Sequence, residues 1–227
     1  MHTFLFIPPM LELASIINKK GLKDSILGVD ICSYGTPSDD MLANETHWCH
    51  SLPGGRFGEA LIHPTYIAQN LIGKLEVRDV WAAKMGSYPW VKYDELHVAL
   101  TSCSKFCNIY MSFNLPRGGF LNITVYTKQS IITLDGGNFA VISRGAFKGG
   151  QKFSKIVDSL SIISQTIKST ARNSFKVLLG RWKSGHETLL RGFVKSIIEN
   201  VEEPYSPGEA YEATETFLRI LEKLGRT

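Results

Sequence analysis

The spacing of hydrophobic side chains changes its period along the chain. Between residues 75 and 143, apolar and polar positions alternate, as at Leu121, Ile123 and Val125, and this alternation predicts β-strands with one buried face. The segments that join these strands are short and often contain glycine pairs, as in residues 135–138, which leaves no room for a crossover helix. We therefore expect these strands to form an antiparallel meander.

In the last third of the chain the period lengthens from two residues to about 3.6. Phe153, Ile156 and Leu160 begin the first of about four apolar stripes at helical spacing. The last stripe starts at residues 206–209, where Ser, Pro and Glu occupy positions typical of a capped helix start. The predicted fold is α+β, an antiparallel β-meander followed by a C-terminal bundle of about four amphipathic helices.

The N-terminal region shows a smaller set of elements. The apolar spacing of residues 10–18 is typical of a short helix, and residues 25–34 have the pattern of a strand. Residues 57–71 again show helical spacing, but Pro64 lacks the amide hydrogen that a helix interior requires. We expect this helix to break or kink at the proline.

The length and composition suit one folded protein. A chain of 227 residues with 44% hydrophobic content can bury a substantial core. We predict that residues 1–150 are mainly β, with one or two N-terminal helices. Residues 151–227 are predicted as a helical C-terminal region packed on the sheet, so that the two parts make one cooperative unit.

Cysteine use and hydropathy indicate the compartment. Four cysteines in a chain of this length do not make a disulfide scaffold, because such scaffolds are short and cysteine-dense. The first ten residues lack the positive segment and cleavage site of a secretory signal. No uncharged apolar run approaches the roughly 20 residues that span a bilayer. We expect an intracellular protein, cytoplasmic or nuclear, that is neither secreted nor held by a transmembrane segment.

Positive charge is concentrated in one segment. Residues 144–195 contain eleven Lys or Arg side chains against Asp158 and Glu187, whereas the net charge of the whole chain is only +4. Residues 199–227 are acidic, with seven Glu against three basic side chains. Local basicity of this kind attracts phosphate-rich partners.

The basic side chains mostly fall outside the apolar stripes of the predicted helices, so they would form a solvent-facing band. We therefore predict a non-enzymatic binding or assembly protein that holds nucleic acid, RNA before DNA, with an acidic membrane surface as the second partner and self-association as a further one. Its general character would be that of a viral matrix or nucleocapsid-associated protein. The predicted nucleic-acid-binding residues are Lys148, Lys152, Lys155, Lys168, Arg172, Lys176, Arg181 and Lys183.

The basic segment is also compatible with an arrangement that involves no nucleic acid or membrane. Its charges can belong to an ordinary solvated helix face, balanced by the acidic C-terminal helix folding back on it as an intramolecular clasp. Deleting residues 203–227 should then raise the affinity for nucleic acid.

A small His and Cys cluster is the closest approach to a metal site. His47, Cys49 and His50 lie within four residues, and Cys103 and Cys107 have a spacing that a tight turn would bring together. Structural zinc takes four nitrogen or sulfur ligands, usually supplied as close pairs. The alternative function is therefore a metal-dependent hydrolase that uses this cluster. Apart from zinc, we expect no cofactor.

Short motifs support no further activity. The run from Gly58 to Tyr66 resembles the opening helix of the ribonuclease III family, but the acidic segment that holds magnesium in that family does not follow it. The glycine pairs match neither the Gly-x4-Gly-Lys-Ser/Thr phosphate loop nor the Gly-x-Gly-x-x-Gly dinucleotide motif. The sequence thus contains no recognisable catalytic signature, which favours the non-enzymatic interpretation.

Overall fold

The computed structural model describes residues 2–145 and 151–225, and the chain divides into two compact units. Unit 1 comprises Met1–Leu27 and Ile123–Ser206, and unit 2 comprises Gly28–Asn122 and Pro207–Thr227. Both units are therefore built from segments that lie far apart in the sequence.

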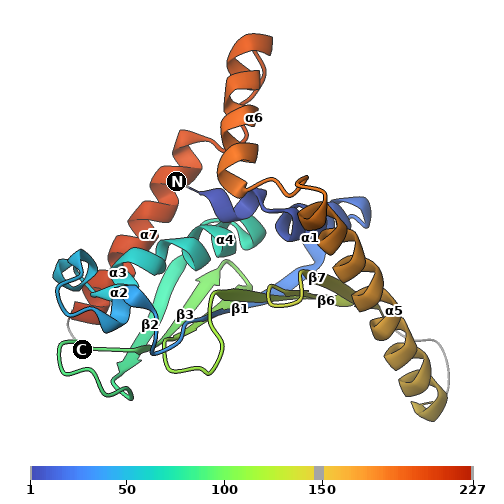
Figure 1. Cartoon of the computed structure of the whole chain (residues 1–227). Helices are drawn as coiled ribbons and strands as arrows, with labels where there is room; N and C mark the ends of the chain where they lie inside the picture. The colour runs from blue at the N-terminus through green and yellow to red at the C-terminus, as the bar shows by residue number, and fades with distance from the viewer. Residues whose placement is uncertain (1, 146–150, 226–227) are drawn as a thin grey trace. The chain divides into compact units, whose positions relative to one another are not determined.

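Most of the strands belong to unit 2, and the longest helix belongs to unit 1 (Figure 1). Unit 2 contains, in chain order, β1 (Ile26–Tyr34, from its third residue), α2 (Asp40–Ala43), η3 (Trp48–Ser51), α3 (Arg56–Ala60), α4 (Ile62–Ile72), β2 (Glu76–Ala83), β3 (Glu95–Ser102), β4 (Lys105–Ser112) and α7 (Pro207–Gly225). Unit 1 contains η1 (Thr3–Phe6), α1 (Pro8–Lys19), η2 (Lys23–Ser25), β6 (Ser130–Asp135), β7 (Ala140–Gly145), α5 (Gln151–Leu178) and α6 (Gly185–Glu199). Strand β5 (Phe120–Thr127) passes from unit 2 into unit 1.

The seven strands have the order β2-β3-β4-β1-β5-β6-β7, so the predicted antiparallel meander is wrong. In unit 2, β3 pairs antiparallel with β2 and β4, but β1 pairs in parallel with β4. Along this pair Gly28 lies opposite Phe106, whose ring fills the space that a Cβ at Gly28 would need. The first strand is thus paired with the fourth, and the sheet contains both parallel and antiparallel pairs.

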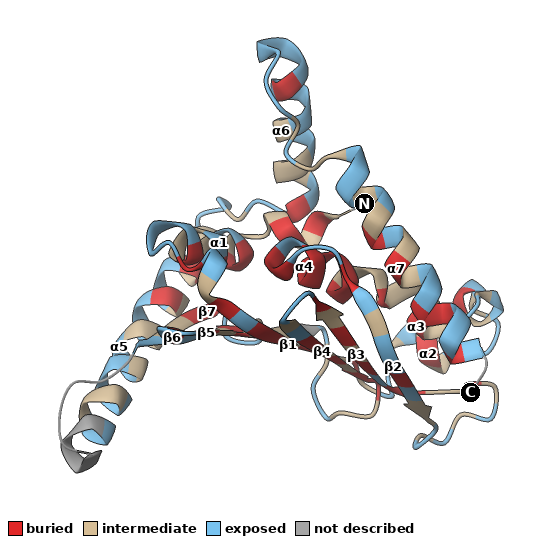
Figure 2. Cartoon of the chain, turned by 180° about the vertical axis from the view of Figure 1, so that it is seen from behind, coloured by how far each residue is buried: buried red, intermediate tan, exposed pale blue. Residues whose placement is uncertain are grey.

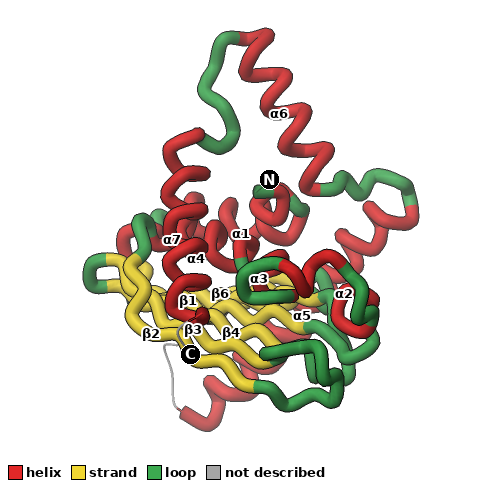
Figure 3. The backbone as a smooth tube through the Cα atoms, turned by 90° about the vertical axis from the view of Figure 1, so that its left-hand side faces the viewer, coloured by secondary structure: helices red, strands yellow, loops and turns green. Residues whose placement is uncertain are grey.

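Helices cover one face of the strands in unit 2. Leu96, Val98 and Leu100 of β3 are fully or almost fully buried, and α7 packs against α4 and β2 (Figures 1 and 3). Trp81, on the alternate face of β2, is half exposed. One apolar face and one partly open face explain the alternation of the sequence.

Pro64 does not break the helix in which it lies. It occupies the third position of α4, within the first turn, where an amide hydrogen has no intrahelical partner to lose. The interruption falls at Leu61 instead, between α3 and α4, and that residue still has right-handed helical dihedral angles. The backbone therefore stays nearly helical from α3 into α4.

Unit 1 contains the antiparallel hairpin of β6 and β7, with α1 packed against both strands and α5 against β7. Figure 2 shows that α5 and α6 are largely exposed along their length. Ile156, Leu160, Ile163 and Ile167 on α5 are each more than half exposed. The predicted C-terminal bundle is therefore wrong, because these apolar side chains do not pack against other helices.

The helices in the described parts of the chain are too short or too polar to span a membrane. This holds for every one of these helices.

Candidate functional site

The residues around His47 form a local turn in unit 2. The His47 ring accepts a hydrogen bond from the Cys49 amide at 3.3 Å, and the Cys49 thiol donates to the Met41 carbonyl at 3.1 Å. A ring nitrogen of His50 lies 3.1 Å from the Asn44 carbonyl. These contacts satisfy the side chains within the turn and give them a structural role.

The other metal candidates lie on the β3–β4 hairpin of unit 2. Cys103 is exposed in the turn with a positive φ of 53°, whereas Cys107 is fully buried in β4. Burial raises the pKa of the thiols of Cys49 and Cys107, which disfavours the thiolate that zinc requires. The described residues contain no group of three or more His, Cys, Asp or Glu placed to hold a metal ion.

A buried acidic pair in unit 2 is satisfied by hydrogen bonds. Glu95 accepts from the Tyr110 hydroxyl at 2.8 Å, the Ser112 hydroxyl at 2.7 Å and the Asn114 amide at 2.7 Å. Asp94 accepts from the same Asn114 amide nitrogen at 2.9 Å. Burial and then the bond to Glu95 raise the pKa of Tyr110. This network fastens the start of β3 to the end of β4 and to the residue Asn114 that follows it.

Six of the eight predicted nucleic-acid-binding residues have side chains that the structure describes. Lys148 and the side chain of Lys152 lie outside the described residues, while Lys155 and Lys168 are exposed on α5. The structure does bring four others together in unit 1, where they line one cavity with α1. These four are Arg172, Lys176, Arg181 and Lys183.

The terminal acidic helix has other contacts. Within unit 2, α7 packs against α4 and β2, and the Lys223 ammonium group donates to the backbone carbonyls of Val77 and Arg78 at 3.1 and 2.9 Å. Arg219 and Glu215 form an ion pair inside the helix at 2.7 Å. These contacts hold α7 within unit 2.

A different group of side chains lies on α3 and α4. Arg56 donates to Asp39 at 3.1 Å and also pairs with Glu59, and its guanidinium group lies 5.0 Å from the centre of the Phe113 ring. Only 12% of the Arg56 side chain is exposed. Arg56 therefore fixes the start of α3 and holds the Glu59 carboxylate in place.

His63 follows Glu59 by four residues, which places both on one side of the helical turn. A nitrogen of its ring, Nδ1, lies 3.0 Å from the hydroxyl of Tyr66, and the two rings meet edge to face. Tyr66 is fully buried and His63 is partly exposed. The His63 ring is thus partly accessible, and the buried Tyr66 hydroxyl fixes its orientation.

The helix that carries His63 is rigidly supported. Residues 64–69 of α4 are all buried, the Thr65 hydroxyl bonds the Leu61 carbonyl at 2.8 Å, and the Gln69 amide donates to the Glu209 carbonyl on α7 at 2.9 Å. A side chain on such a helix keeps its position better than one on a loop. Histidine ordinarily titrates near neutral pH, so it can give and take a proton under physiological conditions.

Comparison with known proteins shows which solved structures share this fold. No family model matches the sequence, and no curated protein matches it either. WlbA dehydrogenase from Bordetella pertussis, solved in complex with NADH and UDP-GlcNAcA, shows a TM-score of 0.68 at 14% identity over 98% of this chain and 61% of its own. Levoglucosan dehydrogenase in complex with NADH gives 0.69 at 13% identity over 99% and 63%.

A third similar structure is UDP-N-acetylglucosamine 3-dehydrogenase from Acidithiobacillus ferrooxidans, with a TM-score of 0.62 at 10% identity over 98% of this chain and 59% of its own. The chain therefore spans about three fifths of the length of these dehydrogenases. At such low identity the similarity establishes a shared fold.

These comparisons overturn several predictions. The nucleic-acid-binding, matrix-like interpretation and its membrane partner are wrong, because the similar structures are dehydrogenases, two of them solved with NADH. The hydrolase alternative is wrong for the same reason, and so is the expectation of no cofactor other than zinc. Part of the local excess of positive charge is neutralised within the structure, since Arg172, Arg191 and Lys195 are in ion pairs.

Proposed function

We propose that this chain supplies the substrate-side part of a nicotinamide-dependent oxidoreductase that acts on a hydroxyl or carbonyl group of a small polar molecule. His63 would hold and transfer the proton of that group. The observation that carries the proposal is the partly exposed imidazole of His63 fixed by the buried Tyr66 hydroxyl. A histidine can assist several kinds of reaction. Because the fold is shared with dehydrogenases, we favour proton transfer that accompanies a redox step.

Each side chain of the group has a distinct part in this proposal. The hydrogen bond between Tyr66 and His63 fixes the plane of the imidazole ring, so that the direction of proton transfer is set before substrate arrives. Glu59, whose carboxylate pairs with Arg56, lies on the same side of the helix and would accept a hydrogen bond from a substrate hydroxyl.

The sequence does not fit a cofactor site of the usual kind. It contains no Gly-x-Gly-x-x-Gly turn for the pyrophosphate of a dinucleotide. The β2–β3–β4 and β6–β7 pairings are antiparallel, unlike the parallel strands that surround such a turn. Nicotinamide binding by this chain would therefore use contacts other than that turn, and we assign no individual residue to it.

Four free cysteines support an intracellular setting as part of the proposal. Cys49 and Cys107 are buried as thiols, and Cys103 is exposed without a disulfide partner. Exposed and buried thiols that stay reduced are typical of proteins in reducing compartments.

The experiment is a redox assay with two histidine variants. The protein is mixed with NAD+ or NADP+ and a panel of sugars, polyols and nucleotide sugars, and formation of the reduced nicotinamide is followed by absorbance. His63→Asn should lower kcat by about 100-fold to 10,000-fold, the usual contribution of a general acid or base. The matched control is His50→Asn, whose ring contacts the Asn44 carbonyl, and it should keep its activity.

Two results would contradict the proposal. One is turnover that His63→Asn leaves unchanged. The other is no turnover with any compound of the panel, together with NMR signals of the His63 ring that none of those compounds shifts.

A further inference from the structure

A cavity of about 620 Å³ lies within unit 1, between α1, the C-terminal end of α5 and the start of α6. Five cationic side chains line it: Lys19 from α1, Arg172 and Lys176 from α5, and Arg181 and Lys183 from the connection to α6. Among the described lining residues one carboxylate, Glu12, accompanies them. Residues from three separate segments thus bring positive charge to one place.

The single carboxylate is already neutralised. Glu12 pairs with the Arg172 guanidinium group and accepts a hydrogen bond from the Ser169 hydroxyl at 3.3 Å. No other carboxylate among the described residues pairs with the remaining four cations, Lys19, Lys176, Arg181 and Lys183. The cavity therefore keeps about four uncompensated positive charges, which repel one another until an anion enters.

Other cations of the same unit show a different arrangement. On α6, Arg191 pairs with Glu187 at 2.8 Å and Lys195 lies 3.5 Å from Glu199. The negative end of the α5 dipole favours a cation such as Lys176, but this effect reaches only the last turn of a helix. The helix dipole does not explain Lys19 of α1, or Arg181 and Lys183 between α5 and α6. The presence of these three cations at one cavity therefore needs another cause.

The rest of the cavity wall suits an organic ligand. Leu11 and Ile16 of α1 contribute apolar surface, and Ser15 and Thr188 contribute hydroxyl groups. The volume lies within the range of roughly 300–1,000 Å³ that is typical of small-molecule sites. It is much larger than a single phosphate ion requires.

We propose that this cavity binds a small molecule that carries a diphosphate, such as a nucleoside diphosphate. Two adjacent phosphates with about three negative charges match four unpaired cations better than one phosphate does. The base or sugar of the ligand would lie against Leu11 and Ile16. The site lies in unit 1 and does not depend on His63 or on the proposed redox function.

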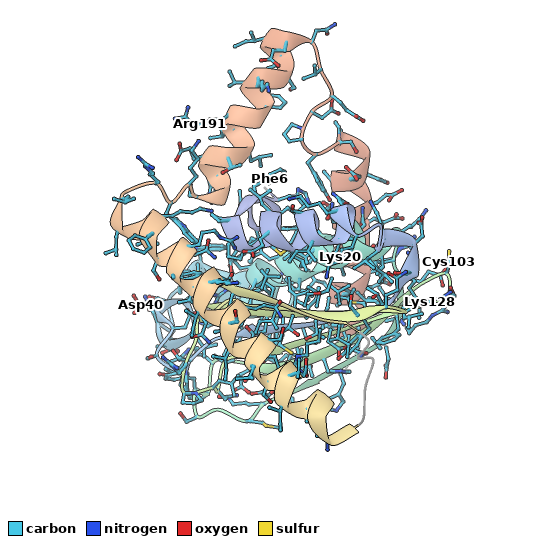
Figure 4. The ribbon with its side chains drawn as sticks, turned by 90° about the vertical axis from the view of Figure 1, so that its right-hand side faces the viewer. Phe6, Lys20, Asp40, Cys103, Lys128 and Arg191 are labelled. Carbon is cyan, nitrogen blue, oxygen red and sulfur yellow. The ribbon has the colours of Figure 1, made fainter. Side chains whose placement is uncertain are left out.

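The test uses calorimetric titration of the whole chain with inorganic pyrophosphate, orthophosphate and ADP. The double variant Arg181→Gln/Lys183→Gln removes two of the cavity's cations, which are exposed and have no described ion-pair partner. The matched control, Arg191→Gln/Lys195→Gln, removes the same charge from α6, where Figure 4 shows Arg191. Circular dichroism with thermal melting checks that both variants are folded.

Pyrophosphate should bind at one site per chain, about tenfold or more tightly than orthophosphate, and ADP should bind at least as tightly as pyrophosphate. The cavity variant should lose about 30-fold or more of this affinity, while the control should lose less than about threefold. No saturable binding of pyrophosphate would overturn the proposal. Equal losses in the two double variants, or equal binding of orthophosphate and pyrophosphate, would overturn it as well.

Discussion

The side-chain amide of Gln165 forms two hydrogen bonds with the backbone of Ser143. The Ser143 amide donates to Oε1 at 2.8 Å, and Nε2 donates to the Ser143 carbonyl at 3.2 Å. One turn further along α5, the Ser169 hydroxyl accepts from the Val141 amide at 3.3 Å. Both backbone residues belong to β7, the last strand of the sheet order, so α5 supplies partners to an edge that another chain could otherwise pair with.

Replacing Gln165 by Ala should destabilise the protein by about 1–2 kcal/mol, because it leaves an amide and a carbonyl of Ser143 without their partners. Urea unfolding followed by circular dichroism measures this change. Ser164→Ala, at the exposed neighbouring position, is the matched control and should have little effect. Equal midpoints for the two variants would show that the edge contact contributes nothing.

The polar face of α5 explains why the hydrophobic pattern predicts the wrong packing there. The apolar spacing of Ile156, Leu160 and Ile163 predicts a stripe that faces the core, yet these side chains are more than half exposed. The sheet is contacted instead by Gln165 and Ser169, which satisfy strand backbone groups. Hydrophobic periodicity finds apolar burial, but it has no signal for a helix that meets a sheet edge through hydrogen bonds.

Tyr66→Phe should reduce turnover by about tenfold or more and leave KM nearly unchanged, since the His63 ring remains but loses the hydroxyl that orients it. The pH dependence of kcat should also be displaced, because this bond influences how readily the ring takes a proton. The measurement is a kcat and KM profile against pH. Tyr88→Phe, which loses an exposed hydrogen bond to the Pro37 carbonyl in the same unit, is the control. A profile identical to that of the unmodified protein would remove Tyr66 from the mechanism.

The candidate site is only partly visible in the sequence. The run from Gly58 to Tyr66 stands out through its likeness to ribonuclease III, and the absent acidic segment then argues against that activity. The informative signal is the spacing of Glu59, His63 and Tyr66, which places them near one another on a helix. The sequence does not reveal the burial of Tyr66 beside a partly exposed His63, since burial depends on the packing of α4.

Gly185→Ala should destabilise unit 1 by about 1–3 kcal/mol, the usual cost of forcing extra atoms into a packed site. A Cβ at Gly185 would overlap the backbone carbonyl of Thr3, so η1 or the start of α6 must move. Thermal unfolding by calorimetry measures the effect. Gly145→Ala in the same unit is the control, because its Cβ would meet only the Gln129 carbonyl at 3.9 Å. Equal melting temperatures for the two variants would refute the steric argument.

Strand positions were predictable and the topology was not. The alternation in residues 96–100 and 121–125 correctly located β3 and β5, because each strand buries one face. The parallel pairing of β1 with β4 joins residues about eighty positions apart, and no local pattern encodes it. Gly28 and Phe106 are complementary in size across the β1–β4 pair, but this relation can be recognised only once the register of the two strands is known.

Stability should fall at alkaline pH through Cys107. Burial, and then the negative charge of Asp30, raise the pKa of its thiol far above the ordinary value. The unfolded chain exposes the same thiol, whose pKa is then about 8.5. Above that pH the unfolded state releases a proton that the folded state retains, so the free energy of unfolding decreases as pH rises. Below it the thiol is protonated in both states and has no effect on the pH dependence.

The expected slope from this thiol approaches about 1.4 kcal/mol per pH unit above about pH 9. Urea unfolding between about pH 7.5 and 9.5 measures it, a window in which tyrosines of ordinary pKa are still mostly protonated. Cys107→Ala should reduce the slope even if it lowers stability at every pH, because the pH dependence belongs to the ionisable group and the packing loss does not. Cys103→Ala, at the exposed turn shown in Figure 4, should keep the slope. An unchanged slope in Cys107→Ala would assign the alkaline sensitivity to other groups.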